Sequence, residues 1–450
     1  MRATGPRPRF QYRVARPAPG QAEACTTNNR SSCGSIAAAL DSLPTFQTRT
    51  PPHPARHPRE SGSSTPALQI LLLAAVLAAG CHRVPEPPTT FTELAPGLGY
   101  TNQHAAGGPW SLHVVRVDRT HPELRFTTAH ARNAALGLDT LSHQVAGLPA
   151  SAGSALAAVN GDFYQRERSH AGDPRGLQIV AGELLSAPKD RIAFWITPKG
   201  EPRLGPVASQ FRVTWPDGSE SPFGLNEERR SNSVVLFTAA AGPSTHSTGG
   251  PEVILEPDLQ SPQSAPEPGA KVRARVREVR TEGNSPIVPG TWVLSLAPQT
   301  PLAQSPPTPG SFLTLSFESD PDLTGVRAGI GGGPVLVQDG RIQRIHPPSK
   351  DAYEFSSMLE RHPRTAIGWN PEYFFLVEVD GRQPGLSVGM TLDELAAYMA
   401  GLGCTDALNL DGGGSATLWA GGRLRNSPCD GQERPIANSL VVVVVRTNAP

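Results

Sequence analysis

Apolar and polar residues alternate over short stretches of this chain, and proline or glycine separates one stretch from the next. Residues 112–117 show the alternation of a half-buried strand. The stretch 440–445 is apolar at every position, which is typical of a central strand covered on both faces. Further strands are expected at 156–159, 191–197, 210–215, 233–238, 271–279, 291–296, 311–317 and 406–410.

Two segments have the spacing of apolar residues that is typical of a helix. The stronger lies at 391–402, where leucine, alanine and methionine recur on one face. Thr391 and Glu394 stand three residues apart at its start, which is the spacing of a capping box. A shorter helix is expected at 139–145, with its cap near Asp139.

Composition favours the same architecture. The 450 residues include 45 Gly and 47 Pro, a content that predicts many turns and argues against a helical bundle. Loops rich in these residues are expected at 242–270 and 297–310. We predict an α+β fold for residues 90–450: a single large domain on a mixed β-sheet core, with a few flanking helices, long Pro/Gly-rich loops and insertions between 200 and 310.

The first part of the chain has a different character. Residues 1–66 are rich in Arg, Pro, Ser and Thr without hydrophobic periodicity, so we expect disorder or a start site placed too early. An apolar run at 68–80 precedes Cys81 and has the length of a signal-peptide core. Its end resembles a bacterial lipobox, in which the cysteine is lipidated. Residues 67–81 therefore predict export to the bacterial cell envelope and a lipid anchor at Cys81.

Charge is unevenly distributed along the chain. The formal net charge is zero, but residues 1–80 carry an excess of six positive charges and the remainder an excess of six negative charges. A mildly acidic body lacks the basic surface that nucleic acid requires. We expect no nucleic-acid partner.

Two of the five cysteines, Cys404 and Cys429, bracket a glycine-rich segment near the end of the chain. In an exported protein such a pair is a candidate disulfide, and two free thiols are the alternative. The chain contains no pair of cysteines or histidines with the spacing of a zinc site.

Four stretches share one arrangement, in which a polar residue and glycines accompany an apolar strand. They are Asn160-Gly161-Asp162, the loop 329–334, Arg364 at the start of an apolar run, and Asp411 before three glycines. The first is also a common hairpin turn, and a buried arginine also occurs in structural ion pairs. The glycine loop lacks the lysine of a nucleotide-binding P-loop, but successive amides can still bind an anion.

These residues suit two kinds of chemistry. Two carboxylates, Asp162 and Asp411, fit glycoside hydrolysis, with one as acid and the other as base or nucleophile. Arg364 and the glycine amides fit a phosphate. Aspartate and asparagine oxygens also fit a hard cation, so metal-dependent hydrolysis is an open alternative. The expected cofactor is accordingly either none or a divalent cation.

Five segments, in this order, resemble the phosphodiester glycosidase family: AAVNGDFY, GIGGGPVLVQDG, RHPRTAIGWN, MTLDELAAYMAGLGCTDALNLDGGGSATLW and RPIANSLVVVV. The resemblance covers about residues 95–446 and is densest at 328–446. It implies hydrolysis of the bond between a sugar's anomeric carbon and a phosphodiester oxygen. Bacterial relatives are exported and often associated with exopolysaccharide, so the implied substrates are phosphosugars of the cell envelope or exopolysaccharide.

The resemblance also assigns site residues. Many family members carry glycine at the position of Asp162, which makes Asp411 the better catalytic candidate. The expected catalytic residues are Asp411, Asp162 and Arg364. The expected substrate-binding residues are Asn160, Gly161, Gly331, Gly332, Gly333, Thr365, Asn409, Gly412, Gly413, Ser415 and Asn438.

The expected mechanism divides the work among these groups. Arg364 and the amides of 331–333 hold the phosphate, which leaves without strong help from a general acid. Asp411 activates water or stabilises the oxocarbenium-like centre. Asp162 and Asn160 bind sugar hydroxyls or a cation, and the glycines beside Asp411 leave room for the ligand.

A second interpretation keeps the pocket without the catalysis, as a surface lipoprotein that binds polysaccharide. The presence of both Asp411 and Arg364 favours the enzyme. In either case the expected partners are a phosphorylated sugar or polysaccharide and, through Cys81, the membrane. The sequence makes no prediction of oligomeric state.

Overall fold

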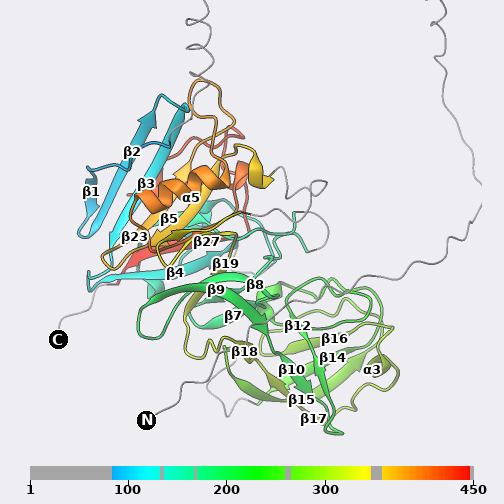
Figure 1. The fold of residues 1–450 in the computed structure, drawn as a ribbon. Coiled ribbons are helices and arrows are strands. Elements are labelled where there is room, and N and C mark those ends of the chain that lie inside the picture. Colours follow the sequence, from blue (N-terminus) through cyan, green and yellow to red (C-terminus); the bar gives the residue numbers. More distant parts are fainter. Residues whose placement is uncertain (1–83, 132–135, 167–169, 259–264, 346–356, 446–450) are drawn as a thin grey trace, which may run out of the picture. The chain divides into compact units, whose positions relative to one another are not determined.

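A computed structural model describes residues 84–131, 136–166, 170–258, 265–345 and 357–445 (Figure 1). The fold below is that of the unit formed by residues 74–450. The predicted disordered segment 1–66, the signal segment 67–81 and Cys81 all lie outside the described residues. No helix among the described residues combines the length and apolarity needed to cross a bilayer.

An eight-stranded antiparallel sheet carries much of the predicted site. Its strand order is β1-β2-β3-β23-β22-β24-β20-β21, so strands that are far apart in the sequence, such as β3 and β23, lie side by side. The strand bounds are β1 Thr92–Ala95, β2 Leu98–Ala105, β3 Trp110–Asp118, β23 Tyr373–Val379, β22 Arg364–Trp369, β24 Asp406–Asn409, β20 Val335–Gln338 and β21 Arg341–Ile342.

A five-stranded sheet in the order β26-β25-β5-β27-β4 packs against the first. The apolar run predicted as a central strand is β27, which pairs with β5 on one side and β4 on the other. That prediction is confirmed. The bounds are β26 Arg423–Leu424, β25 Leu418–Ala420, β5 Ser154–Asn160, β27 Asn438–Val444 and β4 Leu124–His130.

Three apolar clusters hold these layers together. The cluster between the sheets includes Val115 of β3 and Val442 of β27. A second cluster joins the other face of the large sheet to helix α5 (Leu392–Gly401), and a third joins the five-stranded sheet to α2 (Leu141–Ala146). The order of layers is therefore helix, sheet, sheet, helix. Because helices and sheets cover both faces of β3, it is buried almost throughout, not half-buried as its alternation predicts.

Both predicted helices are present. The capping box of α5 is formed as expected, with Thr391 accepting from the backbone of Glu394 and the Glu394 side chain bonding back. Helix α2 is capped by Thr140, one residue after the predicted Asp139.

Two further sheets complete the unit and share one apolar core. The predicted strands between 191 and 317 all lie in them. Strand β14 lies inside the stretch 242–270, which is predicted to be a loop. The sequence does not predict this strand because its apolar residues are few and are flanked by Pro and Gly. The first sheet contains β18 Ser319–Asp320, β9 Pro202–Ser209, β8 Arg191–Ile196, β19 Ala328–Gly331, β6 Gln178–Val180 and β7 Glu183–Ser186. The second contains β11 Glu220–Pro222, β10 Arg212–Thr214, β17 Phe312–Ser316, β15 Lys271–Arg280, β14 Glu252–Pro257, β16 Trp292–Leu296, β13 Val234–Phe237 and β12 Gly224–Leu225.

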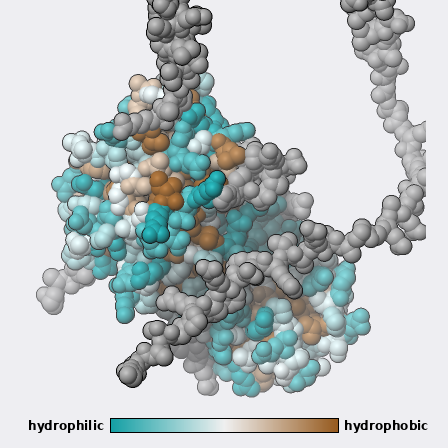
Figure 2. Space-filling view, viewed as in Figure 1, coloured by the Kyte–Doolittle hydropathy of each residue, from teal (hydrophilic) through white to brown (hydrophobic). Residues whose placement is uncertain are grey.

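The fold class is predominantly β. Among the described residues, every strand pair is antiparallel except β12 with β13. The predicted α+β class with a few helices is confirmed in part, and four largely antiparallel sheets take the place of the single mixed sheet that was expected. Several antiparallel pairs, such as β2 with β3 and β22 with β23, are joined by short turns, and others, such as β3 with β23, join distant parts of the chain. Figure 2 shows hydrophobic residues on the visible face in small groups among hydrophilic ones.

Candidate active site

A cavity of about 690 Å³ lies where the predicted segments meet. Strands β22 and β24 are paired, with Ala366 opposite Asn409, so the start of one and the end of the other meet at one edge. The Asp411 amide donates to the Gly161 carbonyl at 2.9 Å, which brings the end of β5 to the same place. The Gly333 amide donates to the Asn409 carbonyl at 2.7 Å and adds the glycine loop.

The cavity wall is strongly cationic. Among the residues that the structure describes, six arginines line it, together with two aspartates, Asp190 and Asp411, and with His362. Excess positive charge in a concave site attracts anions and raises their local concentration. The arginines are Arg166, Arg175, Arg191, Arg364, Arg382 and Arg434.

The predicted site residues separate into two groups. Half of them line the cavity, and the others are buried behind its wall. The lining residues are Gly332, Gly333, Arg364, Asn409, Asp411, Gly412 and Gly413. The buried residues outside the lining are Asn160, Gly161, Asp162, Gly331, Thr365, Ser415 and Asn438.

Asp411 is the candidate catalytic carboxylate that reaches the cavity. One of its oxygens, Oδ1, accepts from the Gly412 amide at 2.9 Å. Burial raises the pKa of Asp411, while the Ser415 hydroxyl, the Gly412 amide and the positive charges of Arg166 and Arg434 lower it. The carboxylate therefore lies in a poorly solvated position among groups that favour its charged form.

The three glycines after Asp411 accommodate the protein's own groups. A Cβ at Gly412 would lie 2.7 Å from the Pro363 carbonyl oxygen, and Gly413 has φ +61°. A Cβ at Gly414 would overlap the Arg434 guanidinium. The expectation that these glycines leave room for a ligand is therefore corrected, because protein atoms occupy the space beside Gly412 and Gly414.

The amides of the second glycine loop are not available to an anion. The Gly331, Gly332 and Gly333 amides donate to the carbonyls of Leu177, Ile192 and Asn409 at 2.7, 3.1 and 2.7 Å. The predicted phosphate-binding nest is therefore wrong. Gly331 has a different role, since a Cβ there would overlap the Asp162 carboxylate.

Arg364 is fixed in the wall by backbone carbonyls. Its Nε donates to Met390 at 2.8 Å, and its Nη2 donates to Ser357 at 2.6 Å and Glu360 at 2.9 Å. Among the described residues no carboxylate lies within ion-pair distance, so the alternative of a structural ion pair is not realised. Burial, and then the charge of Arg382, lowers the pKa of Arg364 to about 10.

Arg382 is a wall residue that the sequence analysis did not single out. Its guanidinium lies 3.2 Å from Nδ1 of His362 and packs against Gly413. The residue itself has φ +57°, an uncommon conformation for arginine. No sequence motif marks this arginine or most of the others, because they come from separate loops that only the fold brings together. Arg364 and Arg434 are the wall arginines that belong to quoted segments.

Asp162 lies behind the wall. Its amide donates to Asn438 Oδ1 at 2.9 Å, its Oδ1 accepts from the Phe163 amide at 2.8 Å, and its Oδ2 has no hydrogen-bond partner in the described part of the chain. Burial raises the pKa of Asp162 to about 7; Arg191 lowers it and Asp411 raises it. The two carboxylates are thus close enough for the charge of Asp411 to affect the pKa of Asp162. Asp162 was expected to bind a sugar hydroxyl or a cation, but it does not line the cavity.

Asn160 joins three segments of backbone. Its Nδ2 donates to the Asp411 carbonyl at 2.6 Å. Its Oδ1 accepts from the Thr365 hydroxyl at 2.6 Å and the Thr417 amide at 3.0 Å. Asn160 is buried outside the cavity lining and positions Asp411, whereas it was expected to face a sugar.

The cysteines do not form a disulfide. Cys404 and Cys429 are both free. Cys404 is buried in the apolar cluster beneath α5, whereas Cys429 lies in a loop beside Asp430. The prediction of a disulfide around the glycine segment is therefore wrong, because the two side chains lie in different environments.

Comparison with known proteins now bears on this cavity. Residues 270–443 match the model of the phosphodiester glycosidase family. These residues belong to that family.

The phosphodiester glycosidase segment supplies most of the wall, including Arg364, Arg382, Arg434 and the run 411–414. Arg166, Arg175 and Arg191 come from outside it, as do Asn160 and Asp162.

One curated relative is the SPbeta prophage-derived protein YomE of Bacillus subtilis, which is 30% identical over 129 residues. That match covers 28% of this chain and 19% of YomE, so the chain spans about a fifth of its relative.

Solved structures share the fold. A hypothetical protein from Synechocystis has a TM-score of 0.63 at 22% identity, covering 81% of this chain and 65% of its own. A putative exported protein from Burkholderia pseudomallei has a TM-score of 0.58 at 23% identity, covering 75% and 74%. The zebrafish N-acetylglucosamine-1-phosphodiester alpha-N-acetylglucosaminidase catalytic domain scores 0.42 at 16% identity, covering 80% and 87%. This last score is below the level at which a shared fold can be argued.

Proposed function

We propose that this chain hydrolyses the bond between the anomeric carbon of a sugar and the oxygen of a phosphodiester. The observation that carries the proposal is the position of Asp411, a carboxylate in the wall of a cavity lined by six arginines. The arginines match the charge of the phosphodiester, and the carboxylate matches the positive charge that develops at the anomeric carbon. The family of residues 270–443 supports the same reaction.

The phosphate is held by side chains in this proposal, since the glycine amides are engaged elsewhere. Arg364 and Arg382 lie close enough for one to lower the pKa of the other, so an anion between them relieves their repulsion. Because Nε and Nη2 of Arg364 donate to backbone carbonyls, its Nη1 is the group proposed to donate to the phosphate, together with the guanidinium of Arg382.

The reaction consumes one water molecule. The bond between the anomeric carbon and the bridging oxygen breaks, and the electron pair leaves with the phosphate. Water oxygen bonds to the anomeric carbon and loses a proton, and the products are the free sugar and a phosphate monoester. Asp411 accepts that proton or stabilises the oxocarbenium-like centre, and a phosphodiester leaves without strong acid assistance.

Release of free sugar from UDP-sugars and from sugar-1-phosphodiester model compounds tests the proposal, with phosphate-free aryl glycosides as controls. Asp411→Asn should lower kcat on the order of 10³-fold without changing the thermal midpoint, because its backbone contacts remain. Asp406→Asn is the matched control, since Asp406 lies on β24, the strand that leads to Asp411, but outside the cavity lining. Near-normal turnover by the Asp411 variant would refute the assignment. Binding without turnover by the wild type would favour a polysaccharide-binding lipoprotein.

The substrate and place of action extend the proposal. We infer that the substrates are phosphosugars of the cell envelope or exopolysaccharide, and that the chain reaches them as an exported protein anchored through Cys81. The apolar run 68–80 and its lipobox-like end support export and anchoring. Mass spectrometry of the mature N-terminus tests this: a lipidated Cys81 at the first position supports it, and a mature chain beginning at Met1 contradicts it.

A further inference from the structure

A buried cluster of ionisable groups lies outside the cavity lining. His113 of β3 and Glu378 of β23 are directly opposite each other in the sheet, so their side chains point to the same face. Asp380 follows Glu378 by two residues and points the same way. One nitrogen or oxygen from each of the three side chains lies within 4.8 Å of the others.

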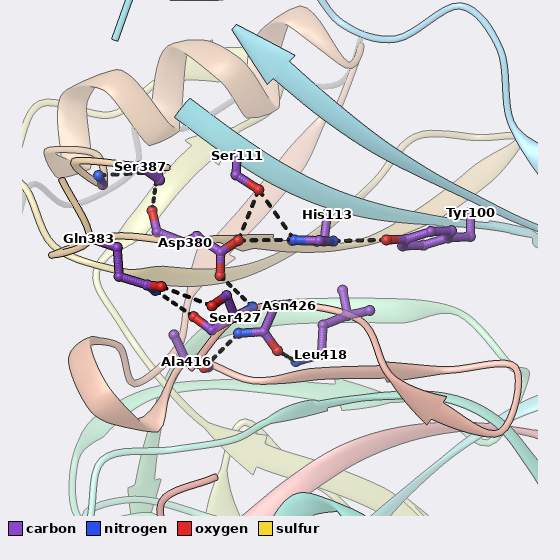
Figure 3. A network of polar contacts seen from close by, with 11 residues as sticks. Tyr100, Ser111, His113, Asp380, Gln383, Ser387, Ala416, Leu418, Asn426 and Ser427 are labelled. Carbon is purple, nitrogen blue, oxygen red and sulfur yellow. Dashed lines mark hydrogen bonds and ion pairs between the residues drawn. The ribbon is translucent and has the colours of Figure 1, made fainter. Parts of the chain in front are cut away.

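Asp380 and His113 are held in place by neighbouring groups (Figure 3). Asp380 Oδ2 lies 3.1 Å from His113 Nε2 and accepts from the Ser111 hydroxyl at 2.9 Å. Its Oδ1 accepts from the Ser427 amide at 2.8 Å. The Tyr100 hydroxyl lies 2.8 Å from the other ring nitrogen of His113, Nδ1. These contacts fix the orientation of the ring and of the carboxylate, as outer partners do in metal sites.

Glu378 is the unexplained member of the cluster. Its side chain is 1% exposed, and neither carboxylate oxygen has a hydrogen-bond partner among the described residues. Such a group is costly to bury, because an unpaired carboxylate loses its hydration without compensation. The Glu378 carboxylate therefore needs either a proton or a cation as its partner.

We propose that His113, Glu378 and Asp380 bind a divalent transition-metal ion, with Zn²⁺ as the reference ion. Two carboxylates and a neutral imidazole carry two negative charges, which one divalent ion neutralises. Imidazole suits Zn²⁺ and related ions better than it suits Ca²⁺ or Mg²⁺. Tetrahedral bonds of about 2.0–2.1 Å separate ligand atoms by roughly 3.3 Å, close to the 3.1 Å between His113 and Asp380.

The ion has a positioning role, because none of its three ligands lines the cavity. Asp380 is two residues before Arg382 in the wall, and its Oδ1 holds Ser427. Next to Ser427, Asn426 donates to the Ala416 carbonyl at 3.2 Å and accepts from the Leu418 amide at 2.9 Å (Figure 3). A metal at this point fixes both the Arg382 loop and the segment that follows Asp411.

Metal binding by the purified chain tests the proposal without any activity assay. After chelator treatment, the chain is incubated with Zn²⁺ alone, dialysed and analysed for metal. We expect about one equivalent of Zn²⁺ per chain and a higher thermal midpoint in its presence. Glu378→Gln should lower the affinity at least about tenfold and remove the thermal shift. Co²⁺ in place of Zn²⁺ should give the visible absorption bands of nitrogen and oxygen ligation in the wild type, which needs no variant.

Two controls separate this site from others. Glu252→Gln changes an equally buried glutamate that accepts from Thr245, Ser285 and Ser295, and it should retain the metal. Asp411→Asn should also retain it, since the cavity is a different site. The proposal is overturned if the wild type binds no stoichiometric Zn²⁺ or Co²⁺. It is equally overturned if Glu378→Gln keeps the metal, or if Asp411→Asn loses it.

Discussion

Asp411 and Asp162 begin from the same local pattern and reach different positions. Each follows the end of a buried strand, each stands beside glycine, and burial raises the pKa of each. Asp411 lines the cavity among arginines, whereas Asp162 lies behind the wall against Gly331. The difference comes from neighbours supplied by other strands, so the local pattern alone does not distinguish a group that meets a ligand from one that supports the wall.

The asparagines repeat this contrast. Asn409 lines the cavity and leaves its Oδ1 without a partner among the described residues. Asn160 uses both ends of its amide within the protein. Changes in the wall should therefore affect catalysis or binding, and changes behind it should affect stability.

The largest effect on stability is expected at Asn160. Asn160→Ala leaves the Thr417 amide and the Asp411 carbonyl without their partners, and we expect a loss of about 3 kcal/mol in the free energy of unfolding. Urea denaturation measures it. Asn232→Ala, at an exposed position, is the control and should change stability by less than about 0.5 kcal/mol. If the urea midpoint of Asn160→Ala equalled that of the wild type, the distinction between residues that line the cavity and residues that support its wall would be contradicted.

A smaller, pH-dependent effect is expected at Asp162. Its pKa of about 7 in the folded chain exceeds its ordinary value of 3.8, so the folded state binds a proton more tightly than the unfolded state. The stability that this proton contributes is present near pH 4 and is lost as pH rises through 7. Between pH 5 and 8, the wild type should lose about 2.6 kcal/mol in its free energy of unfolding relative to Asp162→Asn. If the difference in stability between wild type and Asp162→Asn were the same at pH 5 and pH 8, the raised pKa of Asp162 would be contradicted.

The smallest effect is expected from one arginine among six. Arg382→Ala should raise KM for a sugar phosphodiester about tenfold with a lesser effect on kcat, because one charged contact to the phosphate is lost. Phosphate-free glycosides should show no such change. Arg341→Ala, on an exposed edge strand, serves as the control. Equal losses on both substrate types would count against phosphate binding at Arg382.

The sequence predicts the elements of the fold better than their arrangement. The capping box of α5 and the apolar run of β27 depend on nearby residues, so both are recognisable locally. The antiparallel arrangement of four sheets depends on pairings between distant strands, such as β3 with β23, that no local pattern contains. β14 was missed because six residues between glycine and proline resemble a loop.

The same limit applies to the candidate site. Asp411 and Arg364 were identified because they belong to quoted motifs, and both line the cavity. Arg382 and Arg166 have no motif and enter the wall only through folding. The glycine amides of 331–333 were misjudged because the carbonyls that accept from them belong to other strands and loops.

The position of Asn160 has a consequence for synthesis. Its side chain bonds to partners 205, 251 and 257 residues further along the chain. A ribosome has therefore made almost the whole protein before these bonds can form, and contacts between such distant residues form slowly. A chain terminated before residue 411 has no complete cavity wall, so premature release yields no partially active product.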